Sequence, residues 1–214
     1  MRNIHINIGR QIGAGGLELG KSLSSKLNIK LYDKELITLF AKESGFQRDI
    51  FDKNDEKNSL EYNNSFTLSA FVEAIQNGFG ANYINGAKLF EIQSEVIRNI
   101  AKKESTIILG RCADYILRDF ENSLNIFVSA NMEDRIKRLR KEQKLTGIEA
   151  LSDEKIAALL EKGDRKRAAY YKEYSLKKWG AAESYDLCLN SSLFSINEIV
   201  EIVENYIGKH FRTI

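Results

Sequence analysis

Short apolar segments alternate along the chain with longer stretches of helical periodicity, and this alternation restricts the folds that the chain can adopt. Five segments resemble buried strands, namely 3–8, 30–32, 106–109, 124–128 and 185–189. Apolar residues recur at helical spacing within 89–100 and within 196–207, where Ser195 is the predicted N-cap. The alternation predicts an α/β protein whose parallel sheet is covered on both faces, and such sheets bind ligands beyond the carboxyl ends of their strands.

Two regions depart from the alternation. Residues 44–83 include the polar stretch DKNDEKNSLEYNN and are predicted to be an insertion, while residues 132–180 are long, charged and helical. Segments that close over a parallel sheet are what an active site needs in order to exclude water. The alternative is that residues 132–180 are two solvated surface helices without a functional role.

The stretch GRQIGAGGLELGKS, residues 9–22, admits two registers. Read literally, Gly15 to Ser22 fits the phosphate-loop pattern G-x-x-x-x-G-K-[ST], with Lys21 as the phosphate lysine. Read by periodicity, a helix begins at Gly16 and places Leu19, Leu23 and Leu27 on one buried stripe. The second register explains more of the apolar pattern, so we predict that residues 10–16 form the loop.

In this register the loop is predicted to bind phosphate, because glycines let backbone N–H groups turn inward and the helix N-terminus adds its positive dipole end. Gly16 occupies the lysine position and Leu17 the hydroxyl position, so Arg10 is the nearest cation, with Lys21 as the fallback. The alternative is a glycine-rich turn that binds nothing. The predicted ATP phosphate-binding residues of this stretch are Arg10, Gly13, Ala14, Gly15, Gly16, Leu17 and Lys21.

The composition excludes several classes of protein. The formal net charge of +2 is too close to neutral to indicate a nucleic-acid-binding protein. The chain has two cysteines and two histidines, without a C-x-x-C pattern, which supports neither a disulfide framework nor a zinc site. No apolar stretch approaches the roughly 20 residues that span a bilayer, and the N-terminus carries no signal-peptide pattern, so we expect a cytoplasmic protein without a membrane partner. The oligomeric state stays open.

Three long stretches carry a resemblance to a known family. They are GAGGLELGKSLSSKLNIKLYDKELI at 13–37, IILGRCADYIL at 107–117 and RAAYYKEYSLKKWGAAESYDLCLNSS at 167–192. With these stretches the chain resembles the bacterial cytidylate kinases and, more closely, the cytidylate kinase-like family. The resemblance covers nearly the whole chain and is weakest over 44–83.

The resemblance implies a P-loop kinase fold of the nucleoside monophosphate kinase type. That fold is three-layered, with a five-stranded parallel sheet, a helical monophosphate-binding insertion at 44–83 and a helical lid at 132–180, all within one kinase domain. The core would comprise 1–43, 84–131 and 181–214. The implied reaction is the transfer of a phosphoryl group from ATP to CMP or dCMP, with Mg²⁺, and the implied partners are small-molecule nucleotides.

The resemblance also implies residues that bind the acceptor. Arg111 matches the arginine of the Gly-Arg-Asp motif, which binds the acceptor phosphate, but Cys112 replaces the aspartate near the base. Asp114, two residues later, is the candidate to take that role. Asp33 matches the aspartate at the end of the second strand, although an N-cap for a helix beginning at Lys34 explains it equally well.

The lid stretch Asp164-Arg165-Lys166-Arg167 resembles the Asp-Arg-x-Arg segment of the family. Phosphoryl transfer needs positive charge around the transferred group, so Arg165 and Arg167 are the predicted catalytic residues, with Asp164 orienting one of them. Arg135 and Arg138 share a helix face, and in related kinases arginines here grip ATP phosphates or cover adenine. The tyrosines at 170, 171 and 174 are predicted to pack within the lid.

Three functions remain open at this stage. The first is phosphoryl transfer to a nucleoside monophosphate, with CMP or dCMP as the leading acceptor. The second is nucleotide binding with little catalysis, because Gly16 stands where a phosphate lysine is expected. The third is a kinase with a different small-molecule acceptor, because Cys112 stands where the aspartate is expected.

Overall fold

A computed structural model of the chain describes residues 3–33, 66–67, 83–141, 145–146 and 148–211. Its centre is a five-stranded parallel sheet with the strand order β2-β4-β1-β5-β7. The strands are β1 (His5–Arg10), β2 (Lys30–Tyr32), β4 (Thr106–Leu109), β5 (Ser123–Ser129) and β7 (Leu187–Asn190). The predicted α/β class and the five-stranded parallel sheet are thereby confirmed.

The five strands lie where they were predicted, and the bounds of β1, β5 and β7 differ from the predicted bounds by one or two residues. Residues 30–32 and 106–109 are strands as predicted, whereas β1 begins and ends two residues later than expected. The later end has a physical reason, since β1 continues to pair with β5 up to the Arg10–Val128 partners. Arg10 is therefore the last strand residue, and its side chain follows the two-residue alternation that Ile6 and Ile8 begin.

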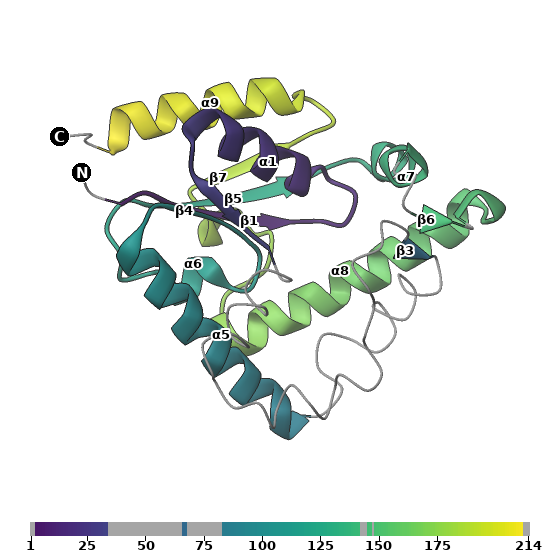
Figure 1. Cartoon of the computed structure of the whole chain (residues 1–214). Coiled ribbons are helices and arrows are strands. Elements are labelled where there is room, and N and C mark those ends of the chain that lie inside the picture. Colours follow the sequence, from purple (N-terminus) through teal and green to yellow (C-terminus); the bar gives the residue numbers. More distant parts are fainter. Residues whose placement is uncertain (1–2, 34–65, 68–82, 142–144, 147, 212–214) are drawn as a thin grey trace.

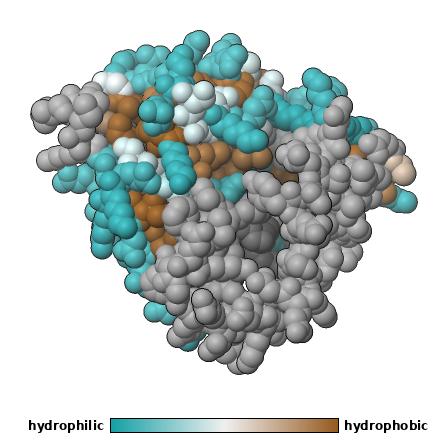
Figure 2. All heavy atoms as spheres, viewed as in Figure 1, coloured by the Kyte–Doolittle hydropathy of each residue, from teal (hydrophilic) through white to brown (hydrophobic). Residues whose placement is uncertain are grey.

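Helices α1 (Gly16–Leu27) and α9 (Ile196–His210) cover one face of the sheet (Figure 1). The core on this side contains Ile8, Leu19, Ile126 and Val203, all of them buried. Helix α9 begins with a capping box, in which the Ser195 side chain accepts the Glu198 N–H and Glu198 reaches back. The predicted N-cap is thus confirmed. Hydrophilic residues cover much of the outer side of α9, and hydrophobic residues show in the band beneath it (Figure 2).

Helices α5 (Tyr83–Lys103) and α6 (Ala113–Ile116) form a second core with the opposite face of the sheet. Tyr32, Ile97, Ile108 and Leu117 are among its buried members. Helix α8 (Asp153–Ser175) is a long rod that runs obliquely past the carboxyl side of the sheet toward α5 (Figure 1). Aromatic contacts join the two helices, because Phe90 of α5 stacks on Tyr174 of α8 with ring centroids 4.0 Å apart.

The described part of the charged region 132–180 is mostly helical, as predicted. It contains α7 (Met132–Lys141), the one-turn helix η1 (Ile148–Ala150) and α8, which together enclose a small core of their own. Ile136, Ile148, Ile156 and Leu160 are buried there, and Ile12 from the glycine loop packs against them. We refer to α7, η1 and α8 as the lid, after the role predicted for residues 132–180. The glycine loop and the lid are therefore connected through apolar packing.

Strand β3 (Phe66–Thr67) pairs in parallel with β6 (Leu145–Thr146) and forms a second, two-stranded sheet. No sequence pattern predicted this sheet. Apart from β3 and the first residue of α5, the predicted insertion at 44–83 lies outside the described residues. Within the described part of the chain, no helix combines the length and the apolar character that crossing a membrane would require.

Candidate active site

The glycine loop leaves the carboxyl end of β1 and enters α1 at Gly16, which confirms the register inferred from periodicity. Gly13 and Gly15 adopt positive φ values of 75° and 79°, a conformation that glycine reaches without strain. At Gly13 an added Cβ would also lie 2.9 Å from the backbone oxygen of Arg135, so the lid approaches the loop closely there. The N–H groups at the start of α1 have no partner within the helix and suit an anion.

Lys21 and Leu17 both lie on the exposed side of α1. Leu17 has 41% of its surface exposed, and a leucine has no oxygen with which to contact phosphate or metal. The side chain of Arg10, by contrast, passes directly over Gly16 and reaches Gly110 at the end of β4. The structure therefore brings Arg10, but not Lys21, to the point where β1, β4 and α1 meet.

The turn after β4 holds Arg111 in an unusual backbone conformation. Gly110, Arg111 and Cys112 have φ values of 77°, 63° and 52°, three left-handed residues in succession. A residue other than glycine pays for this conformation in strain, and such strain is concentrated at functional sites. Arg111 lies against the Tyr170 hydroxyl, where its charge and a hydrogen bond oppose the rise in the pKa of Tyr170 that burial causes.

The two carboxylates predicted to bind the acceptor differ in their surroundings. Asp33 follows β2 directly and is half-buried. Asp114 is buried in α6, and the hydroxyl of Tyr171 in α8 donates a hydrogen bond to its Oδ2 at 2.6 Å. Burial raises the pKa of Asp114, and the hydrogen bond from Tyr171 acts against that rise. Asp114 thus connects α6 to α8.

Neither cysteine has the properties of a nucleophile. Cys112 is buried, and burial raises the pKa of its thiol to about 12, so it is protonated at neutral pH. Cys112 is therefore a packing residue in this structure. Cys188 lies in β7 and is exposed, because β7 is an edge strand of the sheet. Burial also raises the pKa of the Cys188 thiol.

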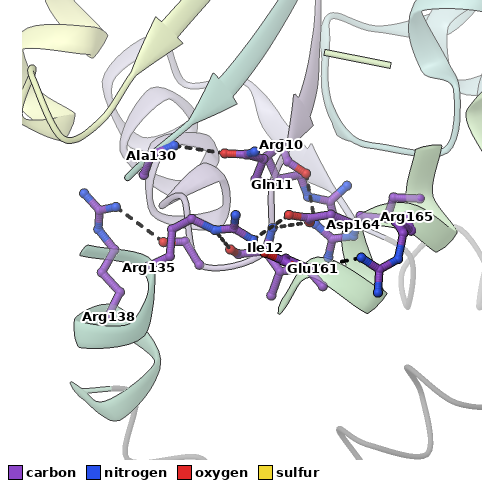
Figure 3. A network of polar contacts seen from close by, with 11 residues as sticks. Arg10, Gln11, Ile12, Ala130, Arg135, Arg138, Glu161, Asp164 and Arg165 are labelled. Atoms are coloured by element: carbon purple, nitrogen blue, oxygen red, sulfur yellow. Dashed lines mark hydrogen bonds and ion pairs between the residues drawn. The ribbon is translucent and has the colours of Figure 1, made fainter. Parts of the chain in front are cut away.

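Two lid residues bond to the backbone of Ile12, one to its N–H group and one to its carbonyl (Figure 3). The Oδ1 of Asp164 accepts the Ile12 N–H at 2.9 Å, and Nε of Arg135 donates to the Ile12 carbonyl at 2.7 Å. The two side chains also pair with each other, with 2.5 Å between Nη2 and Oδ2. Both side chains are largely buried, with 4% and 12% exposed. Asp164 was predicted to orient Arg165 or Arg167, but its side chain pairs with Arg135, and of the two predicted arginines only the charge of Arg167 acts on it.

The two predicted catalytic arginines point in different directions. Arg167 donates from Nη1 to the backbone oxygen of Arg10 at 3.0 Å, and burial lowers its pKa to about 10, which leaves it charged at neutral pH. The positive charges of Arg111 and Arg135 also act on Arg167 and lower its pKa in the same direction as burial. Arg165 faces outward and pairs with Glu161 at 3.6 Å (Figure 3). Arg165 and Glu161 line a cavity of about 420 Å³ together with Trp179.

Arg138 bridges the loop and the end of the sheet. Its Nη1 donates to the Gly13 carbonyl at 3.3 Å and its Nη2 to the Ser191 carbonyl at 2.8 Å. Arg135, Arg138 and Arg167 together occupy backbone oxygens of the loop region, so the lid lies against the loop through side-chain-to-backbone hydrogen bonds.

The model of the cytidylate kinase-like family matches residues 5–193, which is most of the chain. The chain belongs to the cytidylate kinase-like family. The resemblance carried by the three sequence stretches is confirmed. No curated protein matches the sequence.

Solved structures share the fold of this cytidylate kinase-like chain. An uncharacterized protein from Eubacterium ventriosum ATCC 27560 is similar, with 24% identity, a TM-score of 0.67, and 96% of this chain and 99% of that chain covered. Shikimate kinase from Bacteroides thetaiotaomicron is similar at 15% identity and a TM-score of 0.55, covering 96% and 98%. A sugar kinase from Janibacter sp. HTCC2649 has 11% identity, a TM-score of 0.52, and 96% and 95% covered. Family and fold together support a phosphotransferase.

The family implies ATP and Mg²⁺, and the described residues fit the two unequally. The loop amides and the arginines around them suit a triphosphate. P-loop proteins contact Mg²⁺ through a Ser or Thr hydroxyl, and Leu17 takes that position in this kinase-like chain. Among the residues that the structure describes, no group of three His, Cys, Asp or Glu side chains could hold a metal ion. The described residues therefore do not fit a magnesium ion held by protein side chains.

One face of α8 bonds to the sheet side of the molecule, which was not predicted from the sequence. Asp164, Arg167 and Tyr171 stand at i, i+3 and i+7, which places them on the same side of the helix. All three bond to the sheet side of this kinase-like chain, at Ile12, Arg10 and Asp114 respectively. The spacing was present in the sequence and would have distinguished Arg167 from Arg165.

Proposed function

We propose that the chain transfers the γ-phosphoryl group of ATP to a nucleoside monophosphate, with CMP or dCMP as the leading acceptor. In this reaction the bond from the γ-phosphorus to the β,γ-bridging oxygen breaks, and a bond from the same phosphorus to an acceptor phosphate oxygen forms. ADP leaves with the electron pair of the broken bond. A cytoplasmic setting, where ATP is supplied, belongs to the same proposal.

The observation that carries the proposal is the gathering of arginines at the carboxyl ends of β1 and β4. Arg111 follows β4, the side chain of Arg10 reaches the same place, and Arg135 and Arg167 approach from the lid. Phosphoryl transfer requires positioning and electrostatic stabilisation rather than covalent chemistry. Preorganised donors that need no rearrangement provide that stabilisation most effectively.

Each group has a role in the proposed reaction. The amides of 13–16 and the N-terminus of α1 bind the phosphates of ATP, and Arg111 binds the phosphate of the acceptor. Arg167 faces the loop and supplies positive charge to the transferred group, a contribution of about 10³–10⁵ in rate for a positioned arginine. Arg135 and Arg138, which bond to Ile12 and Gly13 of the loop, would grip the phosphates of ATP or cover its adenine.

The proposed division of the chain follows these roles. Residues 1–43, 84–131 and 181–214 form the core, 44–83 form the acceptor-binding insertion, and 132–180 form the lid. The lid contacts the loop directly through Asp164, Arg135 and Arg167. Closure of the lid would exclude water from the transferred group and limit hydrolysis of ATP.

A second candidate is a kinase with another small-molecule acceptor. The position expected to recognise cytosine is Cys112, a buried thiol, and the nearby Asp114 is already bonded to Tyr171. Neither group offers a carboxylate oxygen to an exocyclic amino group in this arrangement. This observation favours weak base selectivity, and an acceptor recognised mainly through the anion that Arg111 binds.

A coupled assay of ADP release over a panel of acceptors tests the proposal. CMP, dCMP, UMP, AMP and GMP form one arm, and non-nucleotide hydroxyl and carboxylate metabolites form the other. We expect release that depends on a nucleoside monophosphate, fastest with CMP or dCMP, and a loss of acceptor saturation in Arg111→Ala. Turnover only in the second arm would favour the second candidate, and ATP binding without turnover on any acceptor would contradict both.

A further inference from the structure

The side chain of Arg10 follows a path that two glycines leave open. A Cβ built at Gly16 would lie 2.7 Å from Cγ of Arg10 and 2.8 Å from its Cβ. A Cβ built at Gly110 would lie 2.1 Å from Nη1 of Arg10. The stem of Arg10 therefore covers the first residue of α1, and the guanidinium lies against the residue that follows β4.

This path places the guanidinium between two phosphate-binding features. On one side is the N-terminus of α1, where backbone N–H groups and the helix dipole favour an anion. On the other side is the left-handed turn that carries Arg111. A cation held between them is within reach of the phosphates that meet at the point of transfer.

The same path explains why position 16 is a glycine. In ordinary phosphate loops this position carries the lysine that contacts the β- and γ-phosphates. Here the stem of Arg10 occupies the space above Gly16, so any side chain at position 16 would collide with it. Arg10 and a lysine at position 16 are mutually exclusive.

Lys21 does not offer an equivalent cation. It is exposed and lies five residues beyond Gly16 in α1, which corresponds to about 7.5 Å along the helix axis. Arg10 is the last residue of β1 and takes its direction from the alternation that buries Ile6 and Ile8 against α1. The position of Arg10 is therefore fixed by the sheet.

We propose that Arg10 is the phosphate-binding cation of this kinase, relocated from the first turn of α1 to the end of β1, and that Gly16 leaves the space that the stem of Arg10 needs. The inference rests on the proposed function, because it names the residue that binds the phosphates of ATP at that site. The proposal predicts that a lysine at position 16 can replace Arg10, but that the two side chains cannot be accommodated together.

The experiment uses the full chain and a non-hydrolysable ATP analogue, with affinity measured by calorimetry. The variants are Arg10→Ala, Arg10→Gln, Lys21→Ala, Gly16→Lys and the double variant Arg10→Ala with Gly16→Lys. Arg10→Gln keeps much of the stem between the glycines and removes the charge, so it serves if the alanine variant does not fold. Lys26→Ala is the matched control, since Lys26 is an exposed cation at the far end of α1.

We expect Arg10→Ala and Arg10→Gln to weaken binding of the analogue by about 10- to 100-fold, the effect of losing a charge-assisted contact. Adenosine affinity should change less than about twofold in the same variants, because adenosine carries no phosphate. Gly16→Lys alone should also weaken binding of the analogue, and the double variant should recover at least about tenfold over Arg10→Ala.

Three results would overturn the inference: retention of analogue affinity within about threefold in both Arg10 variants, a larger loss in Lys21→Ala than in Arg10→Ala, or a wild-type chain that does not bind the analogue. Binding of the analogue requires no acceptor. A wild-type chain that binds it but transfers no phosphoryl group would therefore refute the proposed function separately.

Discussion

At the scale of single residues, exposure separates two arginines that stand two positions apart in α8. Arg167 bonds to the backbone of Arg10, whereas the Arg165 side chain is 70% exposed and pairs only weakly with Glu161. We expect Arg167→Ala to lower kcat by about 10³-fold and Arg165→Ala by less than about tenfold. Steady-state kinetics with saturating ATP and acceptor measure both.

The catalytic role predicted for Arg165 stays a prediction, and this pair of variants decides it. Arg165→Ala is the matched control for Arg167→Ala, since both remove one guanidinium from the same helix. A larger loss of kcat in Arg165→Ala would mean that the lid turns Arg165 inward during the reaction, and it would contradict the roles assigned here.

His5 makes the stability of the sheet depend on pH. It is buried in β1, its Nδ1 lies 3.0 Å from the Thr106 hydroxyl, and burial lowers its pKa from 6.5 to about 4. Above pH 6.5 the imidazole is neutral in both states and contributes no pH dependence. As the pH falls from 6.5 to 4 the unfolded state takes up the proton first, so the free energy of unfolding decreases by up to about 3 kcal/mol.

Urea unfolding between pH 7 and pH 4 measures this dependence, and His5→Asn provides the comparison. The wild type should lose stability across that interval more steeply than the variant, with a difference that approaches about 3 kcal/mol at pH 4. Parallel curves for the two proteins would contradict the assignment to His5.

At the scale of elements, a buried ion pair joins α8 to α7, and both of its members bond to the backbone of Ile12 in the glycine loop. Removing one partner of a buried pair leaves the other charge without compensation, which costs about 3–5 kcal/mol. Arg135 would be that charge in Asp164→Ala, since its side chain is only 4% exposed. We expect the free energy of unfolding to fall by about 3 kcal/mol, measured by urea denaturation.

The exposed pair of the same helix provides the control. Glu161→Ala removes a partner of Arg165, and pairs of this exposure contribute about 0–1 kcal/mol. Equal effects of Asp164→Ala and Glu161→Ala would show that the buried pair does not hold the lid.

The helices and central strands could be predicted because their signals are local. The apolar stripe through Leu19 and Leu23 located the start of α1, and Ser195 located the start of α9. The pairing of β3 with β6 could not be predicted, because each strand has two residues and the partners lie almost 80 positions apart. A strand of two residues is too short to show an alternation of apolar and polar residues.

At the scale of the whole molecule, the site joins residues that the chain keeps far apart. Sequence predicted that Arg10, Arg111 and Arg167 would serve one site, but not that Gly110 would admit the side chain of Arg10. Side-chain paths depend on the spacing of neighbouring strands, and one sequence does not record that spacing.

The contacts between lid and loop predict coupled behaviour of the two. Binding of an ATP analogue should slow hydrogen exchange at the amides of 11–16 and also along 164–171, because Asp164 and Arg167 bond to the loop. The C-terminal half of α5, which packs on the opposite face of the sheet from α1 and α9, serves as the internal control. Protection restricted to the loop would contradict a lid that closes on bound nucleotide.

A crystal structure of the full chain with a non-hydrolysable ATP analogue and CMP would locate both nucleotides on the molecule. The proposed reaction predicts the triphosphate on the amides of 13–16, the guanidinium of Arg10 within hydrogen-bond distance of its terminal phosphates, and the acceptor phosphate at Arg111. A triphosphate bound elsewhere on the molecule, with the loop beside Ala14 left vacant, would contradict it.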